Sequence, residues 1–481
     1  MRQHWLVLKF GGTSVSGRPQ WETIASLARQ RLDSGYRVVL VCSAVSGITD
    51  ALQGLADHAC DFDPAELTRV INRHRQLSVE LEIDSEDLLQ DAAAEIARQL
   101  SLIAGAVEQA DQYAAQACLM SMGEWLSTRL GERYLARSLP LEWVDARQAL
   151  TAIEETSTGG SRGWLSARCE SGADRVLLQK WRHKAPLLIC QGFVAAHPHG
   201  GTALLGRGGS DTSAALLAGR LEADHIEIWT DVPGLFSADP RVIPVARLLH
   251  SLNYDEALEM AASGAKVVHS RCIRAASDVN IPISVRDLAK PEHSGTTIHG
   301  NVASVSGAVE GIRSICRQPN MAVLLLQNLD TREHVGFLAW VFSQISHCGI
   351  SVDLVATSET TTTIALNRTS NQIDDESLAH LAEILRERCS VTVHPRCSTI
   401  NLVGRGARVA LAELDSGSRF FIDHPLLMLS QSANDLCISI LLHSSHADEL
   451  FGILHEALIG SGRNKLLKSG VFGPSWQEIQ G

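Results

Sequence analysis

The sequence argues against disulfide bonds, zinc fingers and membrane-spanning segments. Its eleven cysteines are odd in number and scattered, and no two form a C-x-x-C pair, which indicates reduced thiols rather than a disulfide framework or a zinc site. No apolar run approaches the ~20 residues that cross a bilayer, and the short apolar run near the start contains Lys9, unlike a secretory signal. The formal net charge of −12 argues against nucleic acid or an anionic membrane as the main partner. We therefore expect a cytoplasmic protein.

Motifs for several common chemistries are missing as well. The sequence has no dinucleotide-binding G-x-G-x-x-G, no cluster of spaced metal ligands and no nucleophile set beside a base. What is present is a chain of 481 residues that is 45% hydrophobic and only 5% aromatic. This length exceeds one ordinary hydrophobic core and predicts two or three globular domains.

The amino-terminal part alternates short apolar runs with helical patterns. Residues 37–42 form a continuous, largely β-branched run, typical of a strand buried on both faces of a parallel sheet. Asp63 followed by proline predicts a helix start, and the sequence then indicates mostly helix to about Leu139. Further strands are expected at 186–190, 226–229 and 281–285. The alternation predicts an α/β domain with a mainly parallel sheet.

A polar, Gly/Ser/Thr-rich stretch at about residues 290–305 is a candidate domain boundary. Beyond it, strand-like runs and amphipathic helices of about a dozen residues follow a β-α-β order that occurs twice. The expected strands are 322–326, 362–366, 400–403 and 436–442, and the expected helices are 337–346, 378–388 and 447–458. We expect a domain of residues 1–300, two small α+β modules at 301–395 and 396–465, and a tail at 466–481.

The first candidate site is K-F-G-G-T-S-V, where an apolar strand ends on Lys9 and two glycines. Gly11 and Gly12 would let backbone N–H groups approach a phosphate, with the Thr13 and Ser14 hydroxyls as further donors and the Lys9 ammonium as a counter-charge. The stretch is not a Walker A motif, because the lysine precedes the glycines. Taken alone, it is better explained as the corner of a strand with a solvated lysine at its end.

A second glycine-rich turn, G-R-G-G-S-D, spans residues 206–211 after an apolar run. Ser210 or Asp211 stands where a helix N-cap is expected, and the amino end of a helix offers free N–H groups to an anion. Arg207 could hold a carboxylate or phosphate with two parallel hydrogen bonds. A purely structural loop would not need an arginine and an aspartate among three glycines.

The third candidate is Thr230-Asp231, at the carboxyl end of the strand expected at 226–229. Open α/β sheets bind their ligands at that end of the strands. Residues 232–234 then turn, and Asp239-Pro-Arg241 fixes a second turn. Turn formation without any ligand is the alternative interpretation of this stretch.

Two shorter pieces complete the set. S-A-V-S-G-I-T at 43–49 follows the buried strand 37–42, and Gly123-Glu124 interrupts an apolar helical stretch. A carboxylate in such surroundings is usually paired if it is buried, although Glu124 could also be an ordinary exposed helix residue. Phosphate-binding turns, an arginine for a carboxylate and acids for an ammonium together predict a site for a nucleotide and an amino acid.

These motifs, with W-T-D-V-P-G at 229–234, D-P-R at 239–241 and G-A-K-V at 264–267, resemble the aspartokinase family in order and spacing over the whole chain. The resemblance implies an amino-acid-kinase fold with a mainly parallel central sheet, followed by a pair of ferredoxin-like ACT regulatory modules. It further implies that ATP, with Mg²⁺, phosphorylates the side-chain carboxylate of L-aspartate to give 4-phospho-L-aspartate.

The resemblance also implies roles for single residues. The catalytic residues would be Lys9, Arg207 and Asp211. The aspartate-binding residues would be Thr49, Glu124, Arg207, Ser210 and Asp211. The ATP-binding residues would be Lys9, Gly11, Gly12, Thr230, Asp231, Phe236, Arg241, Lys266 and Val267. No metal-binding side chain is expected, because the phosphates themselves would hold Mg²⁺.

The second half is similar to the regulatory part of lysine-sensitive members, which bind an end-product amino acid and dimerise. This implies lysine as the allosteric effector and a homodimer or tetramer formed through the ACT modules. The effector would lie near Gly336, Phe337, Leu338, Val352, Asp353 and Ser358. Asp353 is the natural partner for the ammonium group of the effector, with a turn or cap residue as the alternative.

The sequence also departs from the family pattern. Phe236 stands where related sequences often carry tyrosine, so one hydrogen bond to the nucleotide is expected to be missing, and Met122 replaces a common histidine. The tail resembles the linker of forms fused to a decarboxylase. A kinase of the same fold that acts on another small acid, and a non-catalytic amino-acid sensor that uses only the ACT modules, are the alternative functions.

Overall fold

The computed structural model describes residues 4–154, 160–265, 267–300, 310–328, 335–412, 424–460 and 465–480. The chain divides into two compact units. The first consists of Met1–Leu235, His250–Leu258 and Lys266–Ser304, and the second of Phe236–Leu249, Glu259–Ala265 and Val305–Gly481. Lys266, one of the predicted nucleotide contacts, lies outside the described residues.

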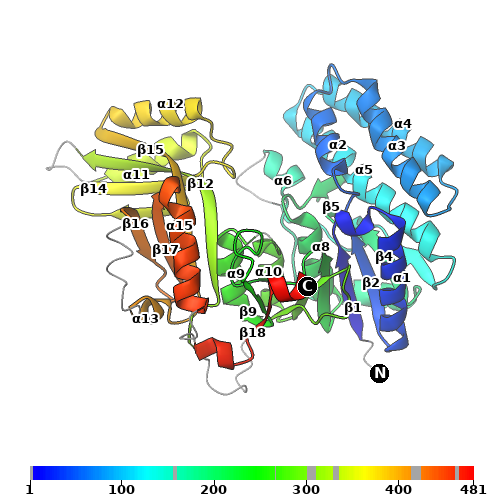
Figure 1. Ribbon diagram of the computed structural model, residues 1–481. Helices are drawn as coiled ribbons and strands as arrows, with labels where there is room; N and C mark the ends of the chain where they lie inside the picture. The colour runs from blue at the N-terminus through cyan, green and yellow to red at the C-terminus, as the bar shows by residue number, and fades with distance from the viewer. Residues whose placement is uncertain are drawn as a thin grey trace. The chain divides into compact units, whose positions relative to one another are not determined.

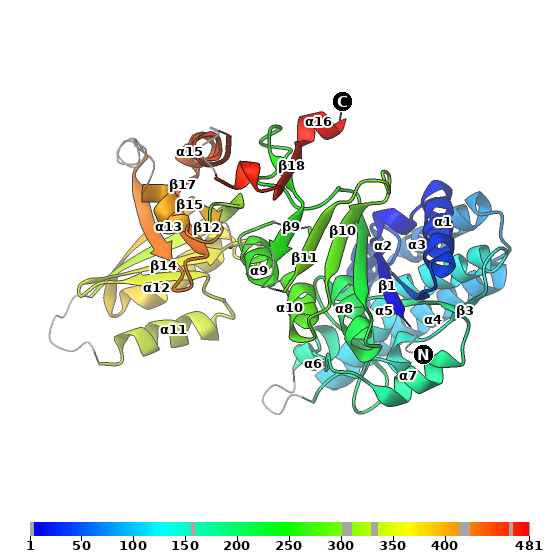
Figure 2. The same ribbon diagram turned by 90° about the horizontal axis from the view of Figure 1, so that it is seen from below.

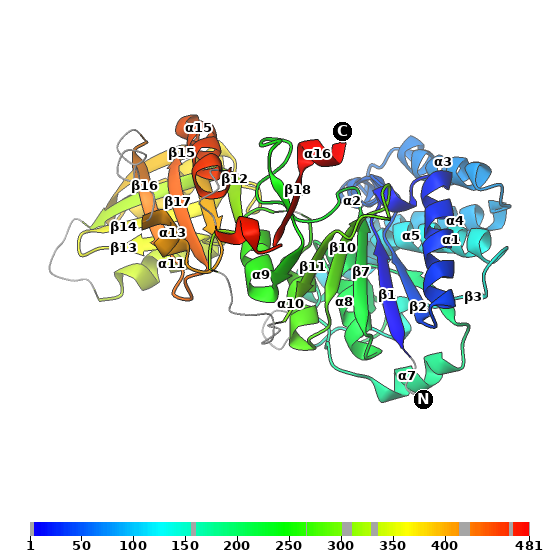
Figure 3. The same cartoon turned by 60° about the horizontal axis from the view of Figure 1, so that its bottom comes forward.

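An eight-stranded sheet forms the centre of the first unit. In spatial order its strands are β3 (Leu141–Trp143), β4 (Leu187–Gln191), β2 (Arg37–Cys42), β1 (Trp5–Phe10), β7 (His225–Thr230), β10 (Ile283–Asp287), β11 (Thr296–His299) and β9 (Ser251–Asn253). All neighbouring pairs are parallel except β10 and β11. Figure 3 shows β2, β1, β7, β10 and β11 in this order. The sequence-based prediction of a mainly parallel α/β sheet is confirmed.

Helices cover this sheet. They are α1 (Arg18–Asp33), α2 (Ile48–Asp57), α3 (Pro64–Glu80), α4 (Glu86–Gly105), α5 (Gln109–Leu135), α6 (Ser161–Leu165), α7 (Arg175–Arg182), α8 (Gly209–Arg220), α9 (Tyr254–Ala262) and α10 (Ser270–Asp278). Asp63 caps α3 as predicted, and its carboxylate accepts a hydrogen bond of 2.9 Å from the Ala65 N–H. Helices α3, α4 and α5 lie side by side (Figure 1).

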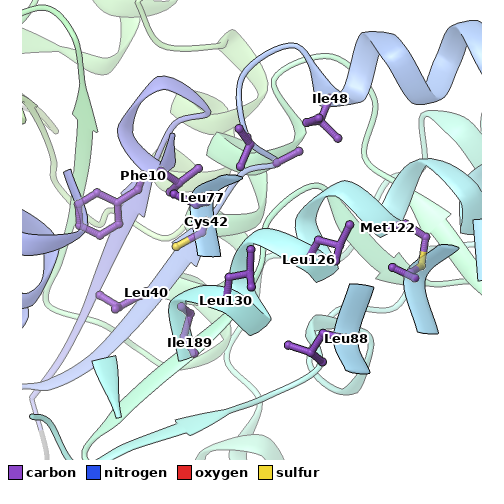
Figure 4. Packing of buried hydrophobic residues seen from close by; sticks show 14 of the residues in the cluster. Phe10, Leu40, Cys42, Ile48, Leu77, Leu88, Met122, Leu126, Leu130 and Ile189 are labelled. Atoms are coloured by element: carbon purple, nitrogen blue, oxygen red, sulfur yellow. The ribbon is translucent and has the colours of Figure 1, made fainter. Parts of the chain in front are cut away.

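The alternation of side chains along β1 explains why both of its faces are apolar. Leu6, Leu8 and Phe10 point into one large core cluster that includes residues of α1 to α5. Figure 4 shows Phe10 and residues of β2, β4 and α5 in this cluster. Val7 lies on the opposite face, which α8 covers. Lys9 shares that face, so the periodicity of the strand directs its side chain toward α8.

Strand β11 lies within the polar stretch that we expected to be a domain boundary. Thr296 is fully buried there because its hydroxyl accepts a hydrogen bond of 2.8 Å from the Leu235 N–H. The polar stretch therefore contains a buried strand, in which the Thr296 hydroxyl has a hydrogen-bond partner inside the protein. Figure 2 shows β10, β11 and β9 next to one another.

A six-stranded antiparallel sheet forms the second unit. Its order is β13 (Leu354–Thr357), β14 (Thr361–Asn367), β12 (Ser314–Asn328), β15 (Cys389–Val403), β17 (Cys437–His443) and β16 (Leu426–Gln431). Helices α11 (Phe337–His347) and α12 (Asp375–Arg386) cover the core beneath β12 and β14. The remaining elements described in this unit include α13 (Ala407–Ala412), α15 (Ser444–His455), β8 (Arg247–Leu249), β18 (Phe472–Ser475) and α16 (Trp476–Gln480).

The two longest strands of this sheet explain how two modules can share it. The first part of β12, Ser314–Gln318, pairs with residues 399–403 of β15, and the part after Met321 pairs with 389–394. Register shifts at Gln318 and Met321 separate the two parts. Residues 314–318, which lie within the first predicted module, thus pair with a stretch of β15 that lies within the second. The boundaries at 301, 395/396 and 465/466 stay predictions.

Candidate active site

Lys9 stands at the carboxyl end of β1, between Val41 of β2 and Ile228 of β7. Its Nζ atom lies 2.6 Å from the Oδ1 atom of Asp211 in α8, and the two side chains are only 11% and 13% exposed. An ion pair shielded from water interacts much more strongly than one at the surface. The structure thereby joins the first and second sequence motifs in one charged pair, across about two hundred residues of chain.

The glycines after Lys9 allow two loops to touch. A Cβ atom on Gly12 would lie 2.9 Å from the carbonyl oxygen of Ala44, in the loop that follows β2. The Ser14 hydroxyl, expected to face a phosphate, is buried and instead donates a hydrogen bond of 3.4 Å to the Trp229 carbonyl. Ser14 therefore fixes the turn against β7, and the predicted phosphate donors that this loop keeps are its backbone N–H groups, the exposed Thr13 hydroxyl and Lys9.

The turn at residues 206–211 packs so closely that it has no space for larger residues. Gly206 and Gly208 have φ angles of +69° and +67°, in the left-handed region that favours glycine. A Cβ atom on Gly208 would lie 2.2 Å from the His269 ring, and one on Gly206 would lie 2.6 Å from the Ser166 hydroxyl. The N-cap of α8 is Gly208 rather than Ser210 or Asp211, which occupy its first turn. The prediction of an N-cap at 210 or 211 was therefore wrong by two or three positions.

Glu124 lies within α5, and its side chain is only 3% exposed. Gly123 makes this position possible, because a Cβ atom there would lie 2.8 Å from the Ala44 Cβ atom. Burial raises the pKa of Glu124 to about 8, although a hydrogen bond with the backbone of Ala44 opposes the shift. Among the described residues its Oε2 atom has no hydrogen-bond partner. A ligand cation would satisfy this oxygen and favour the ionised carboxylate.

A single cavity of about 560 Å³ brings these groups together. Of the predicted aspartate-binding and catalytic residues, it is lined by Lys9, Thr49, Glu124, Arg207, Ser210 and Asp211, together with Gly12 of the nucleotide set. Arg207 is exposed, so its guanidinium is free to meet an incoming anion, whereas Glu124 lies deep. The cavity thus offers a cationic group at its exposed side and an acid in its interior.

The remaining predicted nucleotide residues do not line this cavity. Gly11 lies next to it, with its Cβ position 3.5 Å from the Lys9 Nζ atom. Thr230 and Asp231 end β7, where the Thr230 hydroxyl donates a hydrogen bond of 3.1 Å to the Asp231 carboxylate. Val267 lies between α9 and α10. Phe236 and Arg241 belong to the second unit, and Arg241 pairs with Asp239 at 3.1 Å.

Sequence reasoning missed the apolar wall of the cavity. Met120, Leu165, Phe193 and Leu204 belong to one small hydrophobic cluster and all line the cavity. Phe193 has a φ angle of +67°, which is unusual for an aromatic residue, and its ring lies where a Cβ atom on Gly209 would be. No local motif marks these residues, because four separate stretches of the chain supply them.

The predicted effector residues gather around the start of α11 and strand β13. Gly336 is the N-cap of α11 with a φ angle of +86°, and Leu338 is 39% exposed. The Asp353 carboxylate accepts a hydrogen bond of 2.7 Å from the Asn367 N–H, and burial raises its pKa. Ser358 forms a tight turn with Thr361. Phe337 and Val352 pack against the core beneath the sheet.

Two absences apply to the part of the chain that the structure describes. No helix within it is long and apolar enough to cross a membrane. No group of three or more His, Cys, Asp or Glu side chains among the described residues could hold a metal ion. All eleven cysteines lie in this part, and each is a free thiol.

Known proteins resemble the chain along most of its length. Residues 4–287 match the amino acid kinase family. Lysine-sensitive aspartokinase 3 of Escherichia coli is 31% identical over 404 residues, which is 83% of this chain and 87% of that protein. The crystal structure of E. coli aspartokinase III with aspartate and ADP has a TM-score of 0.76 at 28% identity, covering 95% of this chain and 100% of that one. The form with lysine and aspartate has a TM-score of 0.73 at 27% identity, covering 94% and 99%.

Proposed function

This chain belongs to the amino acid kinase family and, within it, to the aspartokinases, and from that premise we propose how its residues transfer the γ-phosphoryl group of ATP to the side-chain carboxylate of L-aspartate. One observation carries the proposal. Lys9, Glu124, Arg207 and Asp211, from four separate parts of the sequence, surround one cavity of about 560 Å³. Their charges complement an amino acid with two carboxylates and an ammonium group.

Aspartate is held by its three charged groups. The ammonium group contacts Glu124, whose buried oxygen lacks a partner among the described residues. Arg207 binds a carboxylate through two parallel hydrogen bonds, while Thr49 and Ser210 donate their hydroxyl groups. Asp211 orients the Lys9 ammonium through their 2.6 Å ion pair.

The nucleotide approaches the carboxyl ends of β1 and β7. Lys9 and the backbone N–H groups of Gly11 and Gly12 contact its phosphates, and Thr230 and Asp231 contact the rest of it. Phe236, Arg241, Lys266 and Val267 stay predicted contacts on the strength of the family resemblance.

The chemical step needs no general base, because a side-chain carboxylate with an ordinary pKa of ~3.9 is already ionised at pH 7. One of its oxygens forms a bond to the γ-phosphorus. The bond between that phosphorus and the oxygen bridging to the β-phosphate breaks, and its electron pair leaves with ADP. Lys9 neutralises the charge that develops on the transferred group, so alignment and electrostatics supply the rate enhancement.

Mg²⁺ fits this site as an ion carried by the nucleotide. The described residues offer no group of three acidic, His or Cys side chains that could hold a metal ion, and Mg²⁺ in kinases is bound largely by substrate phosphates and water. When bound, it adds positive charge to the phosphate oxygens. Lys9 supplies the protein's own share of that charge.

The second unit binds the regulatory ligand, and lysine is our proposed effector. Its ammonium group would meet Asp353 close to the amino end of α11, with Gly336, Phe337, Leu338, Val352 and Ser358 around it. The unit also carries the contacts of a homodimer or tetramer. Strand β13 supports this proposal, because it is an edge strand of the six-stranded sheet and its side chains are at least partly exposed.

Free thiols support a cytoplasmic setting for this enzyme, because reduced cysteines are typical of that compartment.

A coupled assay of ADP release tests the proposed function. Wild-type protein with Mg-ATP should turn over L-aspartate, and Arg207→Ala should reduce kcat/KM at least ~100-fold because it removes a charge-assisted contact to the substrate. Arg182→Ala, on the surface helix α7, is the matched control and should change kcat/KM less than two-fold.

Two outcomes would contradict the proposal. Faster turnover of L-glutamate than of L-aspartate would indicate a kinase of the same fold for another small acid. Lysine binding without ADP binding or turnover would indicate an amino-acid sensor instead.

A further inference from the structure

A second cavity, of about 330 Å³, lies within the first unit, and the proposed kinase reaction does not use it. Helices α4 and α5 supply one part of its lining. The rest comes from β4, β5 (Val194–Ala196) and the one-turn helix η2 (Ala146–Gln148). This cavity shares no lining residue with the substrate cavity.

Helix α5 stands between the two cavities. Met120 and Glu124, one helical turn apart, line the substrate cavity. Ser121, Met122 and Trp125 line the second cavity. Residues spaced by three or four positions share one face of a helix, so the two sets lie on different faces of α5. The second cavity is therefore a separate site and not an extension of the first.

A buried amide in the second cavity has an unused hydrogen-bond donor. Gln191, at the end of β4, lines the cavity and is only 2% exposed. Its Oε1 atom accepts a hydrogen bond of 3.0 Å from the Ala146 N–H, which fixes the orientation of the amide. Its Nε2 atom has no hydrogen-bond partner in the described part of the chain. A buried donor without a partner is unfavourable, so an acceptor on a ligand would bind well here.

The acidic and basic side chains around the cavity differ in whether they are paired. Glu95 accepts hydrogen bonds of 2.9 and 2.7 Å from Arg98, which lower the pKa of its carboxyl group to about 2. Arg147 pairs with Asp145 at 2.7 Å. Asp91, one helical turn before Glu95, is exposed and has no partner among the described residues. The unbalanced charge of the cavity is therefore the Asp91 carboxylate, which favours a ligand with an ammonium group.

The remaining lining is largely apolar. Met122 and Val194 are 7% and 1% exposed, and the partly buried Trp125 lines the same cavity. An apolar wall with a few placed polar groups is typical of a site for a small organic molecule. The Arg147 guanidinium also donates a hydrogen bond of 3.0 Å to the Thr202 hydroxyl, and it has further N–H groups that suit an anion.

We propose that this cavity binds a small amino acid with an apolar side chain, at a site separate from the substrate cavity and from the predicted effector region. The ammonium group of the ligand pairs with Asp91. Its carboxylate accepts hydrogen bonds from the Gln191 Nε2 atom and from Arg147, and its side chain packs against Met122 and Val194. The inference is independent of the proposed function, because none of these residues has a role in the kinase reaction.

Saturation-transfer NMR on the full chain, with L-leucine as the probe, tests the inference. Saturating L-aspartate is present throughout, so that the leucine methyl signals report binding outside the substrate cavity. We expect a Kd of about 1 mM or tighter, as is usual for a ligand of this size. Two analogues separate the charged groups of the probe. 4-Methylpentanoate lacks the ammonium group, and 3-methylbutylamine lacks the carboxylate.

Two variants address the two charged groups in turn. Gln191→Glu keeps an acceptor for the Ala146 N–H but replaces the free donor by an oxygen. It should weaken L-leucine and 4-methylpentanoate about ten-fold without weakening 3-methylbutylamine. Asp91→Asn should weaken L-leucine and 3-methylbutylamine about four-fold, because the ion pair is exposed, and leave 4-methylpentanoate within about two-fold. Asp33→Asn is the matched control, because Asp33 is an equally exposed acid on α1 that does not line the cavity.

Three results would overturn the inference. They are the absence of saturation transfer from wild-type protein at millimolar L-leucine, a leucine affinity that neither variant changes, and equal losses for leucine and both analogues. Should Gln191→Glu not fold, Asp91→Asn decides alone, because its exposed side chain has no partner among the described residues. The ADP-release assay is a separate measurement, so failure of this inference leaves the kinase assignment standing.

Discussion

The substrate cavity and the predicted effector region are built in opposite ways. Around the cavity, Gly123 and Gly208 have no space for a Cβ atom, and the charged pair of Lys9 and Asp211 is almost closed off from water. In the effector region, the Cβ position of Gly336 has no neighbour within 4 Å, and Leu338 is 39% exposed. The cavity is preorganised by its own packing. The effector region leaves apolar surface for a ligand or a second chain to cover.

Replacing a helical glycine at the cavity should give the largest effect. In Gly123→Ala, the new methyl group would overlap the Ala44 Cβ atom and move the loop that borders the substrate. We expect kcat/KM for aspartate to fall ~100-fold, because displacements of about 1 Å have that effect on positioned groups.

The matched control is Gly54→Ala in α2, where the Cβ position has nothing within 4 Å. There alanine should stabilise the helix by up to ~1 kcal/mol and leave activity intact. Steady-state kinetics and thermal unfolding measure both variants. Equal activity of the two variants would show that the cavity is not built on tight packing.

Glu124 provides a pH test of the same cavity. In the ligand-free protein, the raised pKa of about 8 keeps the Glu124 carboxyl group protonated at pH 7. The ammonium group of bound aspartate would favour the ionised carboxylate. Binding of aspartate at pH 7 should therefore release close to one proton, seen as a difference in calorimetric enthalpy between buffers of unlike ionisation enthalpy. Glu124→Gln should release none and bind aspartate roughly 30-fold more weakly, as expected for loss of a charged hydrogen bond.

The Glu124 carboxyl group also makes the free energy of unfolding depend on pH. In the unfolded chain Glu124 loses its proton near its ordinary pKa of 4.5, whereas the folded protein keeps it to about pH 8. Since the folded state holds the extra proton between these values, stability contributed by this group falls as pH rises across that window. Chemical denaturation of ligand-free protein at pH 5 and pH 8 should show this loss in the wild type but not in Glu124→Gln. A parallel change in both proteins would contradict the assignment.

The smallest effect should appear in the effector region. Asp353→Asn removes the negative charge proposed to meet the lysine ammonium group, but its side chain can still accept the hydrogen bond from the Asn367 N–H. We expect the lysine concentration for half-inhibition to rise about ten-fold, relative to the variant's own uninhibited rate. Glu383→Gln, an exposed change on α12, is the control. Unaltered inhibition in Asp353→Asn would place the effector elsewhere.

The sequence predicted those parts of the molecule that depend on local patterns. The alternation of strands and helices predicted the parallel sheet. Residues 9–15 and 206–211 were predicted as site motifs, and they meet in the Lys9–Asp211 ion pair. Their meeting could be expected from the complementary chemistry of the motifs and from the family resemblance, but not from a local pattern, because packing of β1 against α8 is a long-range contact. The roles of the individual site residues stay predictions until the variants above are measured.

Other features could not be predicted because they depend on packing. The N-cap of α8 is Gly208, where a Cβ atom would lie 2.2 Å from the ring of His269, a residue far away in sequence. The wall formed by Met120, Leu165, Phe193 and Leu204 has no periodic signature, since each residue comes from a different stretch of the chain. Residues 236–249 follow soon after β7 in sequence, yet they form hydrogen bonds with β12, α15, β18 and α16 of the second unit.

The way the chain passes between its units limits how it can be divided in the laboratory. It changes unit after Leu235, Leu249, Leu258, Ala265 and Ser304. An expression fragment cut near residue 300 would therefore carry two excised pieces of the second unit without their partners, and the apolar side chains of Phe236 and Leu249 would lose their cover. Neither unit is one continuous segment of the chain. A chimera that exchanges the second unit between relatives would therefore have to replace three separate segments of the gene at once.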